Sequence, residues 1–202
     1  MLTLYYSPQS RATRVKALLH AMGRCTDVRL CTVEIPRMDD SGRRDPRNPH
    51  PEGKVPALDT GHGVMTESNA IMLYLTDHFD SPLGRGPRDP QRGAYLMWLS
   101  YASGVMEPYY VALAGGRGED PIVQVTYRGG AEIAERLDAA LARGPWLLGD
   151  AFSAADLMVV SPYLWAPDWI PDRPATRDWV ARCAAHPSQA WADAEDRLVL
   201  AA

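Results

Sequence analysis

The sequence has few cysteines, no long apolar run and no leader-like start. Its 202 residues include three cysteines, Cys25, Cys31 and Cys183, and no Cys-x-x-Cys pair. An odd number of cysteines without this spacing argues against a disulfide framework and favours a reducing compartment. No apolar run reaches the ~20 residues that a membrane-spanning helix needs. The first six residues lack the basic and apolar regions of a secretory signal, so we expect a cytoplasmic protein.

Two further absences narrow the function. The longest basic run is Arg43-Arg44 and the net charge is −4, so nucleic-acid binding has no electrostatic support. The five histidines show neither HxxxH nor HExxH spacing, so we expect no metal site. Hydrophobic residues make up 46% of the chain and charged residues 23%, as in a globular protein with a proper core.

The first 79 residues alternate between the periodicities of strands and helices. A strand, a helix that ends at Gly23 and a second strand predict a right-handed βαβ unit with parallel strands. Two short strands joined by Gly61-His62-Gly63, and then a helix, follow. The predicted strands are 2–6, 28–33, 57–59 and 64–66, and the predicted helices are 10–22 and 67–79. We therefore predict an α/β domain of order βαβ-ββα over residues 1–79.

The rest of the chain reads as helical. Residues 80–90 are rich in proline and glycine and predict a linker, and residues 91–202 predict an all-α helical bundle. Its predicted helices are 91–114 with a kink at Pro108, 122–143, one that begins at Ser153, and 176–185. Ser153 and Asp156 have the spacing of a capping box, and the apolar run after them predicts the buried central helix of this domain.

Two short stretches suggest a site for a small peptide zwitterion. The Val55-Pro56 bond has a low penalty for the cis form, and a cis bond there would turn the Val55 N–H and C=O out of the sheet. Glu67 and Ser68 open a predicted helix, whose first N–H groups attract carboxylates. We expect Glu67 to bind an ammonium group, Ser68 a carboxylate and Val55 the middle of the peptide.

These motifs in this order resemble the cytosolic glutathione S-transferases. The resemblance is carried by Gly53-Lys54-Val55-Pro56-Ala57-Leu58, Glu67-Ser68-Asn69-Ala70-Ile71 and the segment 149–156 in the helical part. It implies a thioredoxin-like N-terminal domain and glutathione as the co-substrate. It further implies that Pro56 is the cis proline, that Val55 pairs with the cysteinyl part of glutathione, and that Glu67 and Ser68 hold its γ-glutamyl end. Lys54 is a candidate for the glycine carboxylate.

The same resemblance places the residue that activates the thiol just after the first strand. Ser7-Pro8-Gln9-Ser10-Arg11-Ala12 resembles the serine-using, theta-like branch, which puts Ser7 first and Ser10 second. Tyr5 and Tyr6 follow, although strand alternation turns Tyr6 away if Ser7 faces the site. The alternative is that Ser10, or Ser7 ahead of Pro8, serves only as a helix N-cap and has no catalytic role.

The implied reaction is attack of the glutathione thiol on a hydrophobic electrophile, and family members are usually homodimers. We expect the electrophile between the domains, against aromatic and apolar walls. The candidate wall residues are Tyr101, Met106, Tyr109, Tyr110, Trp165 and Trp169. The alternatives are a glutathione-dependent isomerase or disulfide reductase, and a non-catalytic glutathione-binding or regulatory module on the same fold.

Overall fold

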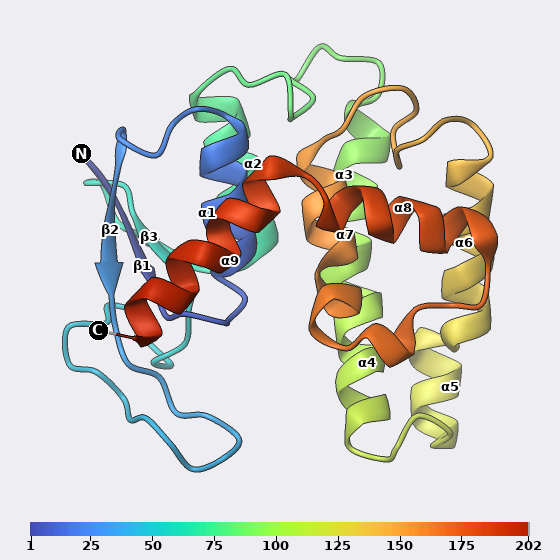
Figure 1. The fold of residues 1–202 in the computed structure, drawn as a ribbon, viewed down its shortest axis with the longest axis horizontal. Coiled ribbons are helices and arrows are strands. Elements are labelled where there is room, and N and C mark those ends of the chain that lie inside the picture. Colours follow the sequence, from blue (N-terminus) through green and yellow to red (C-terminus); the bar gives the residue numbers. More distant parts are fainter. Residues whose placement is uncertain (202) are drawn as a thin grey trace. The chain divides into compact units, whose positions relative to one another are not determined.

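The computed structural model describes residues 1–201, and its N-terminal part is a mixed sheet with helices (Figure 1). The sheet has four strands in the order β2-β1-β3-β4. The first two strands are parallel, and β3 is antiparallel to both β1 and β4. The strands are β1 Leu2–Tyr6, β2 Val28–Thr32, β3 Ala57–Asp59 and β4 Val64–Met65. The predicted order βαβ-ββα is confirmed.

The helices account for most of the remaining chain. Two of them, α1 and α2, belong to the βαβ-ββα order, and the helical part follows α2. The α-helices are α1 Thr13–Ala21, α2 Ser68–His78, α3 Arg92–Tyr101, α4 Glu107–Ala114, α5 Pro121–Tyr127, α6 Gly130–Leu141, α7 Ala154–Trp165, α8 Pro174–Ala184 and α9 Pro187–Leu200. A thioredoxin-like domain with an all-helical second part is therefore the fold class, as predicted. Within residues 1–201 no helix has both the length and the apolar character needed to cross a bilayer.

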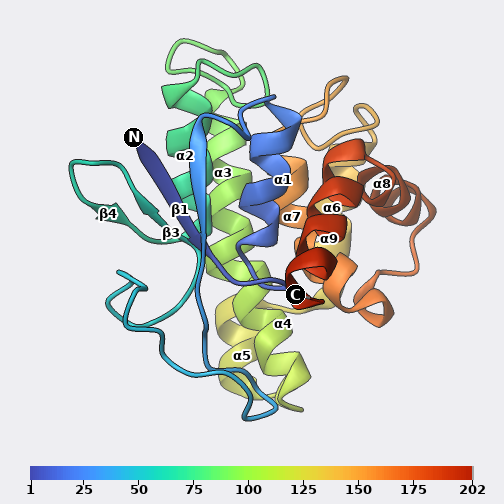
Figure 2. The same cartoon turned by 60° about the vertical axis from the view of Figure 1, so that its left-hand side comes forward.

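The chain divides into two compact units that differ in one respect from the predicted division. One unit is Met1–Leu75 together with the segment that starts at His186, and the other is Thr76–Ala185. The predicted linker at 80–90 stays a prediction. The difference lies in α9, which packs along α1 (Figures 1 and 2). Every residue from Arg14 to Leu19 is buried, because α9 covers a side of α1 that the sheet does not reach.

Two predicted helices are interrupted in the structure. The prediction of one helix over 122–143 was wrong, because α5 ends before Arg128, which has φ of 62°. A new helix then starts at Gly129, whose N–H donates to Glu132 Oε2 at 3.1 Å. The helix predicted over 91–114 is interrupted by a π-helical stretch, Ala102–Met106, just before Pro108, and the kink predicted at Pro108 stays a prediction. Proline has no N–H to donate to the carbonyl four residues earlier, so one hydrogen bond of the regular α-helical pattern is missing there.

Asp156 organises the helical unit from a fully buried position. Its Oδ2 accepts hydrogen bonds from the Ser153 N–H (2.9 Å) and Oγ (2.8 Å). Its Oδ1 accepts from the Leu147 N–H (3.0 Å) and from Trp179 Nε1 (2.9 Å). Burial raises the pKa of Asp156, and the donated hydrogen bonds oppose that rise. One carboxylate thus joins the start of α7, the preceding turn and α8.

We expect Asp156→Asn to lower the free energy of unfolding by about 3 kcal/mol, because the amide turns an N–H₂ donor towards buried donors and leaves them unsatisfied. Urea unfolding followed by tryptophan fluorescence measures this loss. Asp150→Asn, at an exposed position in the same turn, is the matched control and should change stability by less than about 0.5 kcal/mol. Equal losses in the two variants would contradict this role for Asp156.

Candidate functional site

The pairing of β1 with β3 determines which residues meet at one edge of the sheet. Tyr5 lies opposite Ala57 in this antiparallel pair. Beyond that pair, β1 runs on to Ser7 while β3 is approached from Val55. Tyr6, the last residue of β1, packs with Val55 in one apolar cluster. The predicted thiol-activating serine follows Tyr6 directly, so it lies in a segment that adjoins the predicted peptide-pairing residue.

The pairing of β3 with β4 brings the second predicted stretch to the same edge. Leu58 lies opposite Met65, the last residue of β4, and Ser68 follows three residues later in the chain. Ser68 is buried and is the first residue of α2. Because β3 is antiparallel to both β1 and β4, the ends of β1 and β4 and the start of β3 lie at the same end of the sheet, and the segments of Ser7, Ser68 and Val55 adjoin them.

Val55 offers main-chain groups at this edge. The Val55-Pro56 bond is cis, as the resemblance implied. The side chain of Val55 is 9% exposed and packs with Tyr6, Ala12 and Val33 in one apolar cluster. Among residues 1–201, neither the N–H nor the C=O of Val55 has a hydrogen-bond partner. A buried side chain with unpaired main-chain donor and acceptor suits an extended peptide as partner.

Ser7 and Ser10 are distinguished by what their hydroxyl groups do. Ser7 is 3% exposed, and its Oγ accepts a hydrogen bond from Arg37 Nη2 at 3.0 Å. The Ser10 hydroxyl donates to the Ser7 C=O at 2.6 Å and accepts from the Ala12 N–H at 3.1 Å. The hydroxyl hydrogen of Ser10 is therefore already donated to the main chain at the start of α1. The hydroxyl of Ser7 donates to no group among residues 1–201.

Tyr5 and Tyr6, the two tyrosines before Ser7, differ in where their side chains lie. Tyr6 is buried, and Lys16 Nζ lies 4.5 Å from the centre of its ring. Its side chain thus faces α1 rather than the edge of the sheet. Tyr5 is half-buried and packs beside the Val55 cluster.

Glu67 and Lys54 complete the predicted peptide site. Glu67 is exposed and has φ of 68°, in the left-handed region. Its C=O accepts the Ile71 N–H at 2.9 Å, the first bond at the start of α2. The Lys54 ammonium forms an exposed ion pair with Glu52. Lys54 is therefore accessible, but a ligand carboxylate has to compete with Glu52 for it.

Polar side chains hold the loop between β2 and β3, where the structure has no helix between residues 33 and 56. Asp45 accepts the Glu34 N–H at 3.2 Å and Arg47 Nη2 at 2.7 Å. These hydrogen bonds hold the pKa of Asp45 well below its ordinary value. Asn48 Nδ2 donates to the Lys54 C=O at 3.0 Å. These hydrogen bonds therefore hold the loop in one conformation up to Val55.

Sequence patterns did not indicate Asp196, which anchors the segment between Ser7 and α1 to α9. Its Oδ2 accepts the Gln9 N–H at 2.8 Å and Thr13 Oγ1 at 2.6 Å. Its Oδ1 accepts Lys16 Nζ at 2.7 Å, with both side chains at most 4% exposed. These partners are 180 or more residues away from Asp196 along the chain, so a local pattern in the sequence cannot reveal the contacts.

We expect Asp196→Leu to lower the free energy of unfolding by about 3–5 kcal/mol, because it leaves the Lys16 ammonium buried without a counter-charge. Urea unfolding measures the loss. Adding Lys16→Met should recover most of it, since the double variant buries no charge. Asp193→Leu, one turn earlier on α9 and half-buried, is the control. No recovery in the double variant would contradict the ion-pair account.

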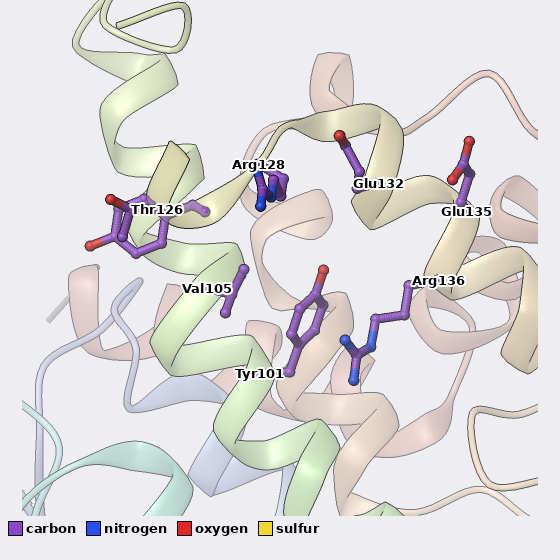
Figure 3. Close-up of a pocket in the computed structure, with 8 residues that line it drawn as sticks. Tyr101, Val105, Thr126, Arg128, Glu132, Glu135 and Arg136 are labelled. Atoms are coloured by element: carbon purple, nitrogen blue, oxygen red, sulfur yellow. The ribbon is translucent and has the colours of Figure 1, made fainter. Parts of the chain in front are cut away.

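The helical unit contains a hollow of about 520 Å³, and one predicted electrophile contact, Tyr101, faces it (Figure 3). Arg136 lies over the Tyr101 ring, 4.2 Å from its centre. The hollow mixes aromatic, apolar and charged groups rather than forming a wholly apolar wall. It is lined by Tyr101, Val105, Thr126, Tyr127, Arg128, Glu132, Glu135 and Arg136.

The other predicted electrophile contacts lie elsewhere in this unit. Met106, Tyr109 and Tyr110 are buried. Tyr110 stacks on Trp169 with ring centres 5.1 Å apart, and Trp165, which is 68% exposed, packs edge-on against Trp169 at 5.3 Å. The predicted set is therefore divided between three core positions and three residues that are at least partly accessible, Tyr101, Trp165 and Trp169. An electrophile site made of these residues stays a prediction.

Within residues 1–201 no group of three or more His, Cys, Asp or Glu side chains is arranged to hold a metal ion.

Two family models match the chain over most of its length. The glutathione S-transferase N-terminal domain matches residues 4–84, and the glutathione S-transferase C-terminal domain matches residues 119–187. Together they span about three quarters of the sequence. The chain belongs to the glutathione S-transferase family.

Individual relatives agree with this assignment. Glutathione S-transferase F14 of Arabidopsis thaliana is 29% identical over 158 residues, which cover 69% of this chain and 62% of the relative. The match thus spans less than two thirds of that protein's length. A glutathione transferase structure from Methylococcus capsulatus has a TM-score of 0.78 at 25% identity, covering 98% of this chain and 100% of the other. A sphingomonad glutathione S-transferase complexed with glutathione has a TM-score of 0.73 at 24% identity, covering 97% and 99%.

Proposed function

We propose that this protein is a glutathione transferase that activates the thiol of glutathione for attack on a hydrophobic electrophile. The observation that carries the proposal is that the segments of Ser7, Val55 and Ser68 adjoin strands at the same end of the sheet. The sphingomonad structure of the same fold is complexed with glutathione, which supports glutathione as the co-substrate here.

Each segment of the edge has a role in this proposal. The N–H and C=O of Val55 pair with the cysteinyl main chain of glutathione. Ser68 and the first N–H groups of α2 bind the γ-glutamyl carboxylate, because a helix N-terminus favours an anion. Glu67 binds the γ-glutamyl ammonium, and Lys54 exchanges its Glu52 partner for the glycine carboxylate. Together these contacts fix the cysteinyl sulfur beside Ser7.

Ser7 activates the sulfur in this scheme. A free cysteine-like thiol has a pKa of about 8.5. To lower this pKa by about two units, the site must stabilise the thiolate relative to the thiol by roughly 2.7 kcal/mol. The Ser7 O–H donates a hydrogen bond to the sulfur, and the partial positive charge at the N-terminus of α1 also stabilises the thiolate. The thiol proton leaves to solvent. The thiolate then forms a carbon–sulfur bond with the electrophile as the leaving group departs, or as an epoxide ring opens.

The engagement of the Ser10 hydroxyl supports Ser7 over Ser10 as the donor, since the Ser10 hydrogen is already donated to the Ser7 C=O. The three cysteines give no support to a disulfide reductase that uses a protein thiol. Cys25 and Cys31 are half-buried on the α/β unit, and Cys183 is buried in α8, where burial raises the pKa of its thiol. The isomerase and the non-catalytic module remain alternatives without an observation in their favour.

We expect the protein to bind glutathione in calorimetry and to conjugate it to a chlorinated dinitrobenzene. Ser7→Ala should raise the pKa of the bound thiol by about one to two units, which lowers kcat/KM at neutral pH by about 10–100-fold. The ultraviolet absorbance of the bound thiolate, followed against pH, measures the shift.

Ser10→Ala is the matched control, because it removes a hydroxyl from the same segment. It should cost about 1 kcal/mol of stability and leave the thiol pKa within about half a unit of the wild-type value. The assignment of Ser7 fails if Ser10→Ala moves the thiol pKa and Ser7→Ala does not. Absence of glutathione binding in the wild-type protein would refute the proposed function itself. We also propose a cytoplasmic homodimer on the family resemblance, and light scattering tests the dimer.

A further inference from the structure

Arg37 reaches the thiol-activating serine from the loop that follows β2. Its Nη2 donates to Ser7 Oγ at 3.0 Å and to the Pro8 C=O at 2.7 Å. The backbone around Arg37 is folded back on itself, because the Arg37 N–H donates to the Ser41 C=O at 3.0 Å and the Arg37 C=O accepts the Asp40 N–H at 3.2 Å. The guanidinium is thus presented by a turn rather than by an extended loop.

The direction of this hydrogen bond determines what the Ser7 hydroxyl can still do. Arginine has only donors, so Ser7 Oγ is the acceptor, and a hydroxyl has one hydrogen and two acceptor lone pairs. Among residues 1–201, Ser7 Oγ donates to no other group. Its hydrogen therefore remains available for a ligand, while one lone pair is held by a cation.

A charged donor strengthens the hydroxyl as a donor in turn. Hydrogen bonds in a chain polarise one another, and those from an ionised donor are the stronger ones. Guanidinium also stays protonated throughout the working pH range. A sulfur that accepts from Ser7 lies one hydrogen bond beyond Arg37, within the roughly 4–6 Å at which an opposite charge favours the anionic form of a group.

Acidic groups near Arg37 are already engaged. Asp39, in the same turn, accepts the Ser41 Oγ at 2.6 Å and the Ser41 N–H at 3.1 Å. Glu34 pairs with Arg43 at 2.9 Å. Arg37 also interacts electrostatically with Asp39, but neither carboxylate has a hydrogen bond to Arg37 among the described residues, and the guanidinium donates to Ser7 and Pro8.

We propose that Arg37 is a positioning residue that polarises the Ser7 hydroxyl towards the glutathione sulfur. This inference rests on the proposed function, because it requires glutathione at the edge of the sheet. It adds a residue from a polar loop to the thiol-activating machinery and assigns it an action through Ser7 rather than a contact with the peptide.

The test uses the full chain with Arg37→Met, Arg37→Lys and the matched control Arg43→Met. Arg43 lies on the same loop, is largely exposed and pairs with Glu34, so its replacement removes the same charge away from Ser7. The readouts are the pH titration of thiolate absorbance with bound glutathione and the affinity for S-methylglutathione, which has no thiol. Circular dichroism checks that each variant is folded.

We expect Arg37→Met to raise the pKa of the bound thiol by about one unit, which lowers kcat/KM below that pKa by about tenfold. Affinity for S-methylglutathione should change less than twofold. Arg37→Lys should recover part of the shift, since lysine keeps the charge but not the planar fork. Arg43→Met should match the wild-type protein.

A double-variant cycle separates action through Ser7 from general electrostatics. In a Ser7→Ala background, Arg37→Met should shift the thiol pKa clearly less than it does in the wild-type background, because the group that it polarises is gone and only the direct effect of the charge remains. Fully additive shifts would overturn the positioning role. So would an Arg37→Met variant that loses affinity for S-methylglutathione with an unchanged thiol pKa, which indicates a contact with a ligand carboxylate. If the wild-type protein shows no bound thiolate, the proposed function and this inference both fail. If it does and Arg37→Met leaves the pKa unmoved, only this inference fails.

Discussion

The register of β3 against β1 is the constraint on which the candidate site depends. Tyr5 pairs with Ala57, and this one pairing brings the end of β1 and the start of β3 to the same edge. The β3–β4 pairing then adds the start of α2. A slip of one residue would turn every side chain of a strand to the opposite face. Leu4 and Leu58 are both fully buried. They oppose such a slip, because it would turn their side chains out of the hydrophobic core.

Polar contacts from distant parts of the chain then fix the segments that the sheet brings together. Asp196 on α9 holds the backbone at Gln9 and the side chain of Thr13. Arg37, on the loop after β2, holds the hydroxyl of Ser7. Both contacts converge on the short stretch between β1 and α1. A serine whose position is fixed from two sides is preorganised, so little free energy is spent on ordering it when a thiol arrives.

Local patterns in the sequence predicted the strands, α1, α2 and the cap at Ser153, since each depends on residues within a few positions of one another. Family motifs predicted the cis bond at Val55-Pro56, which the structure confirms. The break at Arg128 was missed because the apolar spacing continues across it. Asp196 and Arg37 were missed for a different reason. Each acts over a long sequence separation, and neither lies in a periodic segment that points to its partner. The electrophile contacts stay predictions, since aromatic residues at helical spacing serve a core and a pocket equally well.

A crystal structure of this protein with glutathione tests the central claim most directly, because that claim is geometric. The account predicts that the cysteinyl main chain of glutathione pairs with the N–H and C=O of Val55. The γ-glutamyl carboxylate should lie at Ser68, and the sulfur should lie within hydrogen-bond distance of Ser7 Oγ. Glutathione bound away from this edge, or with its sulfur against Ser10 or Tyr5 instead of Ser7, would contradict it.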